Sequence, residues 1–163
     1  MSELDLLRKI ADLEARLARL ESDDRTRYST GTWTPSFTGT GTAGVFTYTV
    51  QVGFYTRIGR LVFYNGDLGI SAISTPPVGN MRISGLPFAA ENTSSNYSPA
   101  ALGYIHNFNF SAGALGMAGY TVQNSTQVYL AEYYDNASAG AAPAANFTNA
   151  SCYLIFGGVY LAG

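Results

Sequence analysis

Residues 46–54 read FTYTVQVGF, with an apolar or aromatic side chain at every second position. Successive side chains of a β-strand point to opposite faces of a sheet, so this alternation predicts a strand whose even-numbered residues form one buried face. The run 61–70 follows a glycine-bearing turn at 57–60 and again places apolar side chains at even-numbered positions. The sequence therefore predicts a β-hairpin that closes at this turn.

Further strands are predicted along the rest of the chain, because short apolar runs alternate with turn signals. These runs lie near 80–86, 100–110, 114–122, 126–134 and 150–161. The last one is almost continuously apolar, which is typical of a strand buried on both faces, here near an axis shared by several copies. An Ala/Gly stretch at 137–145 is expected to be a loop. Seven or eight short strands with no helix between them predict an antiparallel, jelly-roll-like β-sandwich.

Residues 1–27 are a different kind of segment, since they hold 13 of the 20 charged side chains and contain neither glycine nor an aromatic residue. Five apolar residues recur there at alternating spacings of four and three, a period that indicates a helix. They are Leu6, Ile10, Leu13, Leu17 and Leu20. Ser2 and Asp5 fit a helix N-cap followed by an acid. A lone helix with so narrow a seam is marginal in water, so we expect copies of it to form a short coiled coil.

The charges beside this seam favour a parallel arrangement of the copies. Lys9 and Arg16 fall at heptad position g, and Glu14 and Glu21 fall at position e. Each cation then meets an anion of the neighbouring helix only in a parallel, in-register bundle. The heptads leave the choice between a dimer and a trimer open. The alternative to a coiled coil is an amphipathic helix docked on its own domain.

Charge is scarce in residues 28–163, which carry only the remaining seven charged side chains. About a quarter of the residues of an average soluble domain are charged, so we expect identical copies to cover part of this surface.

A formal net charge of −2 gives no basic patch for nucleic acid, and no apolar run is long enough for membrane insertion. One cysteine and one histidine cannot form a structural metal site, and we expect neither a metal nor a cofactor.

Three short blocks carry a family resemblance. They are Gly31–Pro35 (GTWTP), Val52–Val62 (VGFYTRIGRLV) and Ile83–Phe88 (ISGLPF). In this order, and after a heptad coil, they resemble the C-terminal head domains of tailed-bacteriophage tail fibres and tailspikes. The resemblance implies a parallel homotrimer whose fibrous stem carries a β-sandwich knob that meets the host surface. It favours three helices for the coil, although a stem of about 30–35 Å is shorter than such stems usually are.

Two stretches hold the residue types that recognise sugars, whose rings stack on aromatic side chains and whose hydroxyls donate to carboxylate or amide oxygens. One is 132–136 (EYYDN), and the other is the polar loop 92–97. The candidate ligand-binding residues are Tyr97, His106, Glu132, Tyr134, Asp135 and Asn136. The alternative is that these tyrosines pack between sheets or subunits and that His106 is a structural or surface histidine.

No catalytic residue is predicted. His106 has no nucleophile motif beside it, and beyond the coil only four carboxylates are present for glycosidic cleavage. They are Asp67, Glu91, Glu132 and Asp135. We expect Asp67 to form a salt bridge with Arg57 or Arg60.

We predict structural roles for two apolar residues. Trp33 lies just before Pro35 at the junction of the two segments, and we expect it to anchor the coil to the knob. Cys152 has no cation near it in the sequence to stabilise a thiolate, so we expect it to be packed in the interior.

These patterns predict two domains, a parallel coiled-coil stem at 1–27 and a β-sandwich knob at 28–163. We expect a virion protein, made in the host cytoplasm, whose homotrimer adheres to a host-surface glycan or protein. Its N-terminus would attach it to other virion proteins. The alternative is a trimeric capsid or tail decoration protein without a ligand, and a glycan-cleaving tailspike ranks third.

Overall fold

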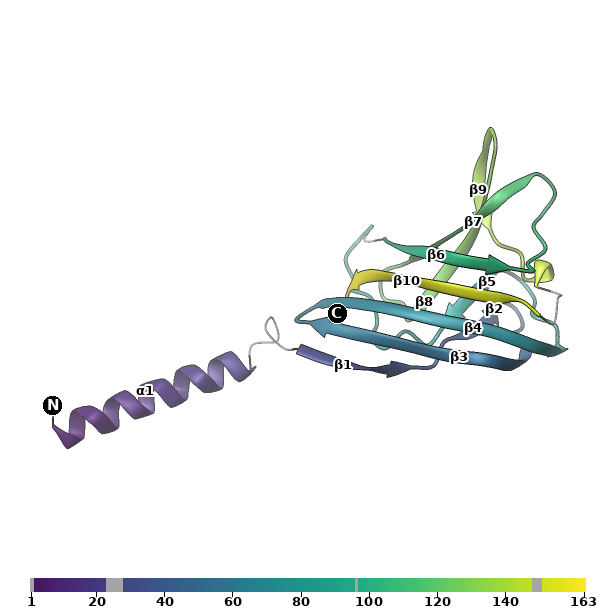
Figure 1. Ribbon diagram of the computed structural model, residues 1–163. Coiled ribbons are helices and arrows are strands. Elements are labelled where there is room, and N and C mark those ends of the chain that lie inside the picture. Colours follow the sequence, from purple (N-terminus) through teal and green to yellow (C-terminus); the bar gives the residue numbers. More distant parts are fainter. Residues whose placement is uncertain (1, 23–27, 96, 148–150) are drawn as a thin grey trace.

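The computed structural model describes residues 2–22, 28–95, 97–147 and 151–163, with a helix in front of a body made of strands (Figure 1). The helix, α1 (Glu3–Ser22), begins at the predicted cap. The Asp5 N–H donates to Ser2 Oγ (3.2 Å), and the Ser2 hydroxyl donates to the Asp5 carboxylate (2.7 Å). These reciprocal bonds stabilise the first turn, and the bond from the Ser2 side chain lowers the pKa of Asp5.

The apolar seam of α1 is uncovered within one chain. Every residue from 2 to 21 is exposed, and along the seam the exposed fraction runs from 43% at Ile10 to 61% at Leu20. The helix projects away from the strands (Figure 1), so it is not docked on its own knob. Within the described ranges no helix combines the length and the hydropathy that crossing a membrane requires. The seam is available to other copies, and the coiled coil itself stays a prediction.

Ten strands make up the described part of the knob. They are β1 (Tyr28–Trp33), β2 (Ser36–Gly39), β3 (Val45–Ile58), β4 (Leu61–Thr75), β5 (Met81–Ser84), β6 (Ser98–His106), β7 (Ala114–Thr121), β8 (Gln127–Tyr134), β9 (Ala137–Ala141) and β10 (Tyr153–Leu161), with a 3-10 turn, η1 (Ala144–Asn146), before β10. The mainly β prediction is confirmed, and the predicted hairpin is β3–β4. The other five predicted strands correspond to β5, β6, β7, β8 and β10.

The strands pair antiparallel along one path, β1-β3-β4-β10-β6-β7-β8-β5-β2, with β9 beside β8. β6 and β7 pair over only three residues, Ser98–Ala100 against Gly119–Thr121, and there the path continues into a second layer (Figure 1). Thr34 and Pro35 alone link β1 to β2, so the two ends of the path lie close together. One layer therefore consists of β1, β3, β4, β10 and β6, and the second consists of β7, β8, β5 and β2, with β9 beside β8. The jelly-roll assignment stays a prediction.

The core lies between these layers, and Trp33 is one of its central side chains. The indole is 7% exposed, donates from Nε1 to the Asn65 carbonyl (3.0 Å), and meets the rings of Tyr64 and Phe156 edge-on at 6.2 and 6.0 Å. It is thus a core residue that fixes the end of β1, and not the contact between coil and knob that its place in the sequence suggests. Cys152 is buried, as predicted.

A β-bulge in β3 overturns the single buried face predicted for residues 46–54. Tyr48 and Val50 lie opposite adjacent residues of β4, which leaves Thr49 without a partner. One extra residue moves every later side chain to the other face. Tyr48 therefore packs on the core, whereas Phe54 is 54% exposed.

β10 buries one face within the chain, and burial of its other face against further copies stays a prediction. Leu154, Phe156 and Tyr160 are almost fully buried. On the opposite face, Ile155 and Leu161 are 43% and 39% exposed.

The sequence patterns do not predict β1, β2 or β9. β9 lies in the stretch expected to be a loop, where it pairs with β8 as a hairpin. Its residues, ASAGA, are small and have little preference for strands, so pairing with β8 determines the structure of this segment.

Substituting Gly53 by alanine should destabilise the knob. A Cβ at this position would lie 2.2 Å from Trp33 Nε1, and the core holds the indole in place. We expect a loss of about 1–3 kcal/mol in the free energy of unfolding. Gly140→Ala in β9 is the matched control, because its added Cβ meets nothing within 4 Å. Urea unfolding followed by Trp33 fluorescence measures both variants, and equal stabilities would contradict the close contact.

Candidate functional site

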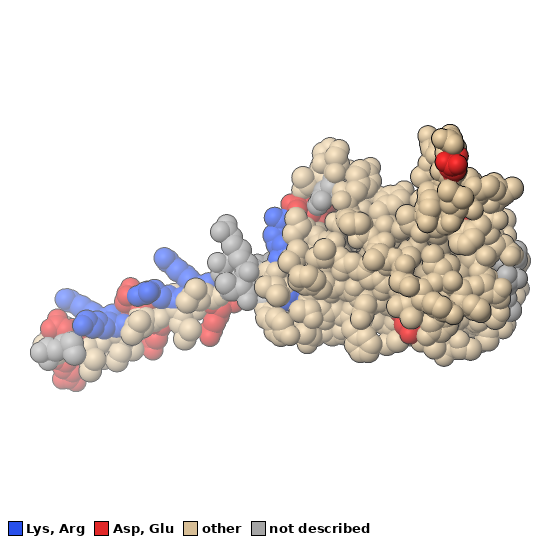
Figure 2. Space-filling view, turned by 45° about the horizontal axis from the view of Figure 1, so that its top comes forward, with Lys and Arg blue, Asp and Glu red and all other residues tan. Residues whose placement is uncertain are grey.

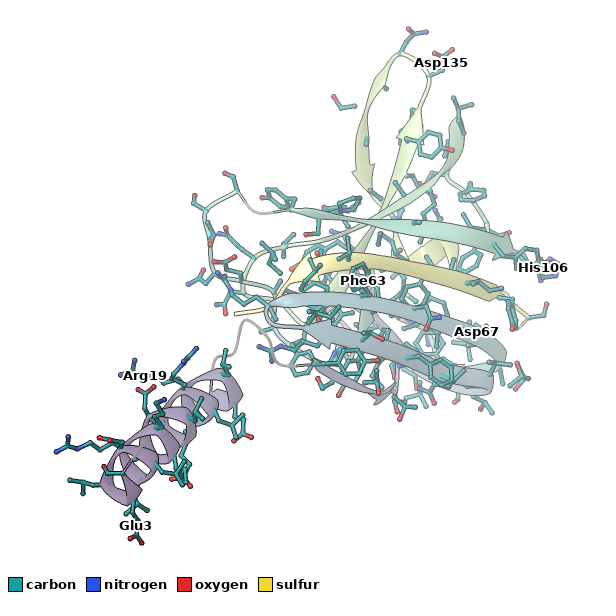
Figure 3. The ribbon with its side chains drawn as sticks, turned by 60° about the vertical axis from the view of Figure 1, so that its left-hand side comes forward. Glu3, Arg19, Phe63, Asp67, His106 and Asp135 are labelled. Atoms are coloured by element: carbon teal, nitrogen blue, oxygen red, sulfur yellow. The ribbon has the colours of Figure 1, made fainter. Side chains whose placement is uncertain are left out.

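The β8–β9 hairpin stands out from the body of the knob and ends in polar side chains (Figure 1, Figure 3). Asp135 lies at its tip, next to Asn136, whose φ of 56° is one that asparagine tolerates in a turn. Both residues are exposed, and the ring of Tyr133 is 46% exposed. The candidate stretch 132–136 is therefore the end of a projecting hairpin.

Glu132, at the base of this hairpin, is buried, and both of its carboxylate oxygens accept hydrogen bonds. Its Oε1 accepts from the Ser111 backbone N–H (3.1 Å) and from Asn146 Nδ2 (2.8 Å), and its Oε2 accepts from the Tyr134 hydroxyl (2.9 Å). Asn146 also donates to Ser111 Oγ (2.9 Å). The network joins β8 to η1 and to the segment before β7, and it fixes the Tyr134 ring.

Two opposing effects act on the pKa of Glu132. Burial raises it, but hydrogen bonds from Ser111, Tyr134 and Asn146 stabilise the carboxylate and bring the pKa below its ordinary value. A general acid in glycoside hydrolysis needs a raised pKa and a free path to the glycosidic oxygen. Glu132 is placed as a structural acceptor that positions Tyr134.

The six candidate residues do not converge on one site. Tyr97 lies just before β6 and packs on Tyr120 with ring centroids 6.1 Å apart, whereas His106 ends β6 and stacks on Tyr104. The length of β6 separates Tyr97 from His106 by roughly 30 Å. Neither belongs to the β8–β9 hairpin. The structure thus brings together only Glu132 with Tyr134, and Asp135 with Asn136.

A second surface is formed by the layer of β1, β3, β4, β10 and β6, on the side that turns away from the core. We call it the outer face, and alternate residues of these strands form it. Its larger side chains are Tyr28, Val52, Phe54, Ile58, Leu61, Phe63, Asn65, Asp67, Tyr104, His106, Tyr153, Ile155, Val159 and Leu161. Among these side chains only Asp67 carries a formal charge. Figure 2 shows how few charged side chains reach the visible side of the knob, in contrast with the helix.

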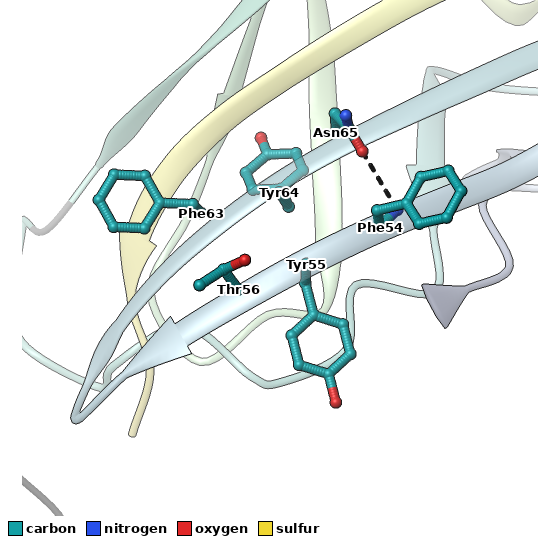
Figure 4. A pocket seen from close by; sticks show the side chains of 6 residues that line it. All are labelled: Phe54, Tyr55, Thr56, Phe63, Tyr64 and Asn65. Atoms are coloured by element: carbon teal, nitrogen blue, oxygen red, sulfur yellow. Dashed lines mark hydrogen bonds between the residues drawn. The ribbon is translucent and has the colours of Figure 1, made fainter. Parts of the chain in front are cut away.

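Two shallow hollows adjoin each other on the outer face. Phe54 and Phe63 flank the first, together with Thr56 and Asn65, and the Asn65 side chain accepts from the Phe54 N–H at 3.2 Å (Figure 4). The second shares Phe54 and Asn65 and extends to Asp67 and to Ile155 of β10. The sequence patterns do not predict this surface, although the apolar Leu61 and Phe63 at odd-numbered positions of 61–70 are a sign of it.

Asp67 does not form the predicted salt bridge. It lies five residues along β4 from Val62, the partner of Arg57, which is a separation of roughly 17 Å. Arg60 pairs with Glu91 instead. The Asp67 carboxylate accepts from the Tyr153 hydroxyl, a bond that raises the pKa of Tyr153. Its Oδ1 is buried and has no hydrogen-bond partner among the described residues.

Within the described ranges no group of three His, Cys, Asp or Glu side chains is arranged to hold a metal ion. Cys152 donates from Sγ to the Asn107 carbonyl (3.0 Å), which is consistent with a packing role.

Comparison with known proteins supports the fold. No protein-family model and no curated protein sequence matches the chain. Among solved structures, the Dettilon tailspike protein gp208 is similar over 83% of this chain, with a TM-score of 0.68 and 20% sequence identity. The chain spans 24% of that tailspike's own length. The resemblance to phage tailspike domains is thus confirmed at the level of the fold.

Acidification should weaken the knob through Glu132. Because its folded pKa is lowered, ionised Glu132 stabilises the fold above its ordinary pKa of 4.5, and this stabilisation is lost as the pH falls through the lower folded value. Glu132→Gln should flatten the pH dependence below about pH 5 and cost about 1–3 kcal/mol at neutral pH. Urea unfolding at a series of pH values measures both effects.

The control is Glu91→Gln, which removes a carboxylate that pairs with Arg60 near the surface. We expect it to change the pH dependence less than Glu132→Gln, because solvent screens the pair. If Glu132→Gln kept the wild-type pH dependence, the role assigned to the buried carboxylate would be wrong.

Proposed function

We propose that this chain is a subunit of a trimeric phage virion protein, a tail fibre or tailspike component that adheres to the host cell surface. The tailspike-like fold, the exposed heptad seam and the weakly charged knob support this proposal. Three parallel helices would form the stem, and three knobs would present the same binding surface. Multivalent attachment then raises avidity without any additional contact per site.

The β8–β9 hairpin is the element that best supports adhesion. Its tip combines an exposed aromatic ring, Tyr133, with the carboxylate of Asp135 and the amide of Asn136. This is the combination that sugar recognition uses, a ring for stacking and oxygens for hydroxyl groups. The buried Glu132 network fixes the base of the hairpin, which lowers the conformational entropy lost on binding. We therefore infer that a host-surface glycan is the ligand.

Removal of a side chain at the hairpin tip should weaken adhesion while leaving the fold intact. Full-length Tyr133→Ala and Asp135→Ala should each reduce binding to an array of bacterial capsular and O-antigen polysaccharides by at least about tenfold. The reason is that each variant removes either the stacking surface or a charged acceptor. Tyr97→Ala is the matched control, because it removes another exposed tyrosine far from the hairpin.

The outcomes separate the candidate functions. Binding lost only in Tyr97→Ala would keep adhesion but move the site to the start of β6. A wild-type trimer that binds no polysaccharide on the array would favour the decoration protein over the adhesin. Shortening of a bound polysaccharide would favour the glycan-cleaving spike.

A further inference from the structure

The outer face collects much of the apolar surface that a single knob leaves in water. Outside the helix, thirteen large apolar side chains in the described ranges are exposed, and seven of them lie on this face. They are Tyr28, Phe54, Ile58, Phe63, Tyr104, Ile155 and Leu161. Contiguous apolar surface of this kind on a soluble protein marks an interaction site.

The dimensions of the outer face match those of a protein interface. Five strands at about 4.8 Å spacing and nine residues of β10 at about 3.4 Å each give roughly 700 Å². A standard interface buries about 800 Å² on each partner. The face is therefore large enough to account for a stable contact between two copies.

One polar atom on this face also needs a partner from outside the chain. Asp67 Oδ1 is buried and finds no donor in the described part of the chain, although the same carboxylate accepts from Tyr153. A buried carboxylate oxygen without a donor is destabilising. A donor from a second copy would complete its hydrogen bonding.

The position of the stem indicates that the molecule covering the outer face is a second copy of this chain. Six Cα steps connect Ser22, at the end of α1, to Tyr28, so the stem-side edge of the outer face lies within roughly 20 Å of the helix end. A parallel bundle of α1 helices would therefore hold this edge of each outer face close to the shared axis. The seam of α1 and the outer face would then form one continuous contact between copies.

We propose that the outer face is the surface through which the knobs of neighbouring subunits contact each other, with Phe63 and Ile155 near its centre and Asp67 accepting a hydrogen bond from the neighbouring subunit. The proposal rests on the trimer of the proposed function and names the surface that builds it. It places the β8–β9 hairpin, which belongs to the other layer, outside the interface and free for a ligand.

Cysteine labelling of the full-length chain tests this assignment. Phe63→Cys and Leu115→Cys, each combined with Cys152→Ala, place one thiol on the outer face and one on β7, at positions that are 45% and 64% exposed in a single copy. In the assembled protein, maleimide should modify the thiol at position 63 at least about tenfold more slowly than the thiol at position 115. Comparable rates in an intact trimer would overturn the face assignment and leave the trimer standing. A monomeric wild-type chain would instead refute the proposed function itself.

Charge insertion gives a second, independent measurement. Phe63→Asp should lower the apparent mass in light scattering, or raise the concentration needed for assembly by at least about tenfold. Leu115→Asp should leave both unchanged. Equal assembly of the two variants would contradict the proposed interface even if one cysteine variant failed to fold.

Discussion

The rest of this structure depends on one constraint, which is that a single copy leaves many apolar side chains exposed to water. The seam of α1 is exposed along its whole length, and the knob adds a second apolar face on the layer of β1, β3, β4, β10 and β6. Only seven charged side chains lie beyond residue 27, so there is little charge repulsion between copies to keep such surfaces apart in solution. Burial in contacts between identical copies would remove both surfaces from water at once.

A second constraint acts in the interior of the knob, where side chains must pack closely around aromatic rings. Gly53 and Gly66 lie where a Cβ would meet Trp33 and Phe156 at 2.2 and 2.4 Å, so the absence of side chains makes room for the rings. The same β3–β4 hairpin carries Phe54 and Phe63 on its other side. One hairpin therefore contributes to the core on one face and to the proposed subunit contact on the other.

The elements with a strong period could be predicted from the sequence, and those determined by long-range pairing could not. Heptads predict α1, and alternation predicts the β3–β4 hairpin. The bulge at Thr49 leaves no mark in the pattern, yet it moves Phe54 from the expected core to the surface. β9 forms because β8 offers it an edge, not because its residues prefer a strand.

The candidate site follows the same division. The residue types of 132–136 indicate a polar, aromatic stretch, but only the fold shows that Glu132 turns inward while Asp135 reaches the tip. The alternation of side chains along β8 indicated that Glu132 turns inward, because Glu132 lies on the same face as the buried Val128 and Leu130. The outer face was harder to predict, since it combines residues from five strands that are distant in the sequence.

The mass of the full-length chain in solution tests the dependence on identical copies most directly. Light scattering over a wide concentration range should give three times the chain mass of 17.4 kDa, about 52 kDa. A stable species of 17.4 kDa at high concentration, with the leucine seam and the outer face both in water, would contradict it.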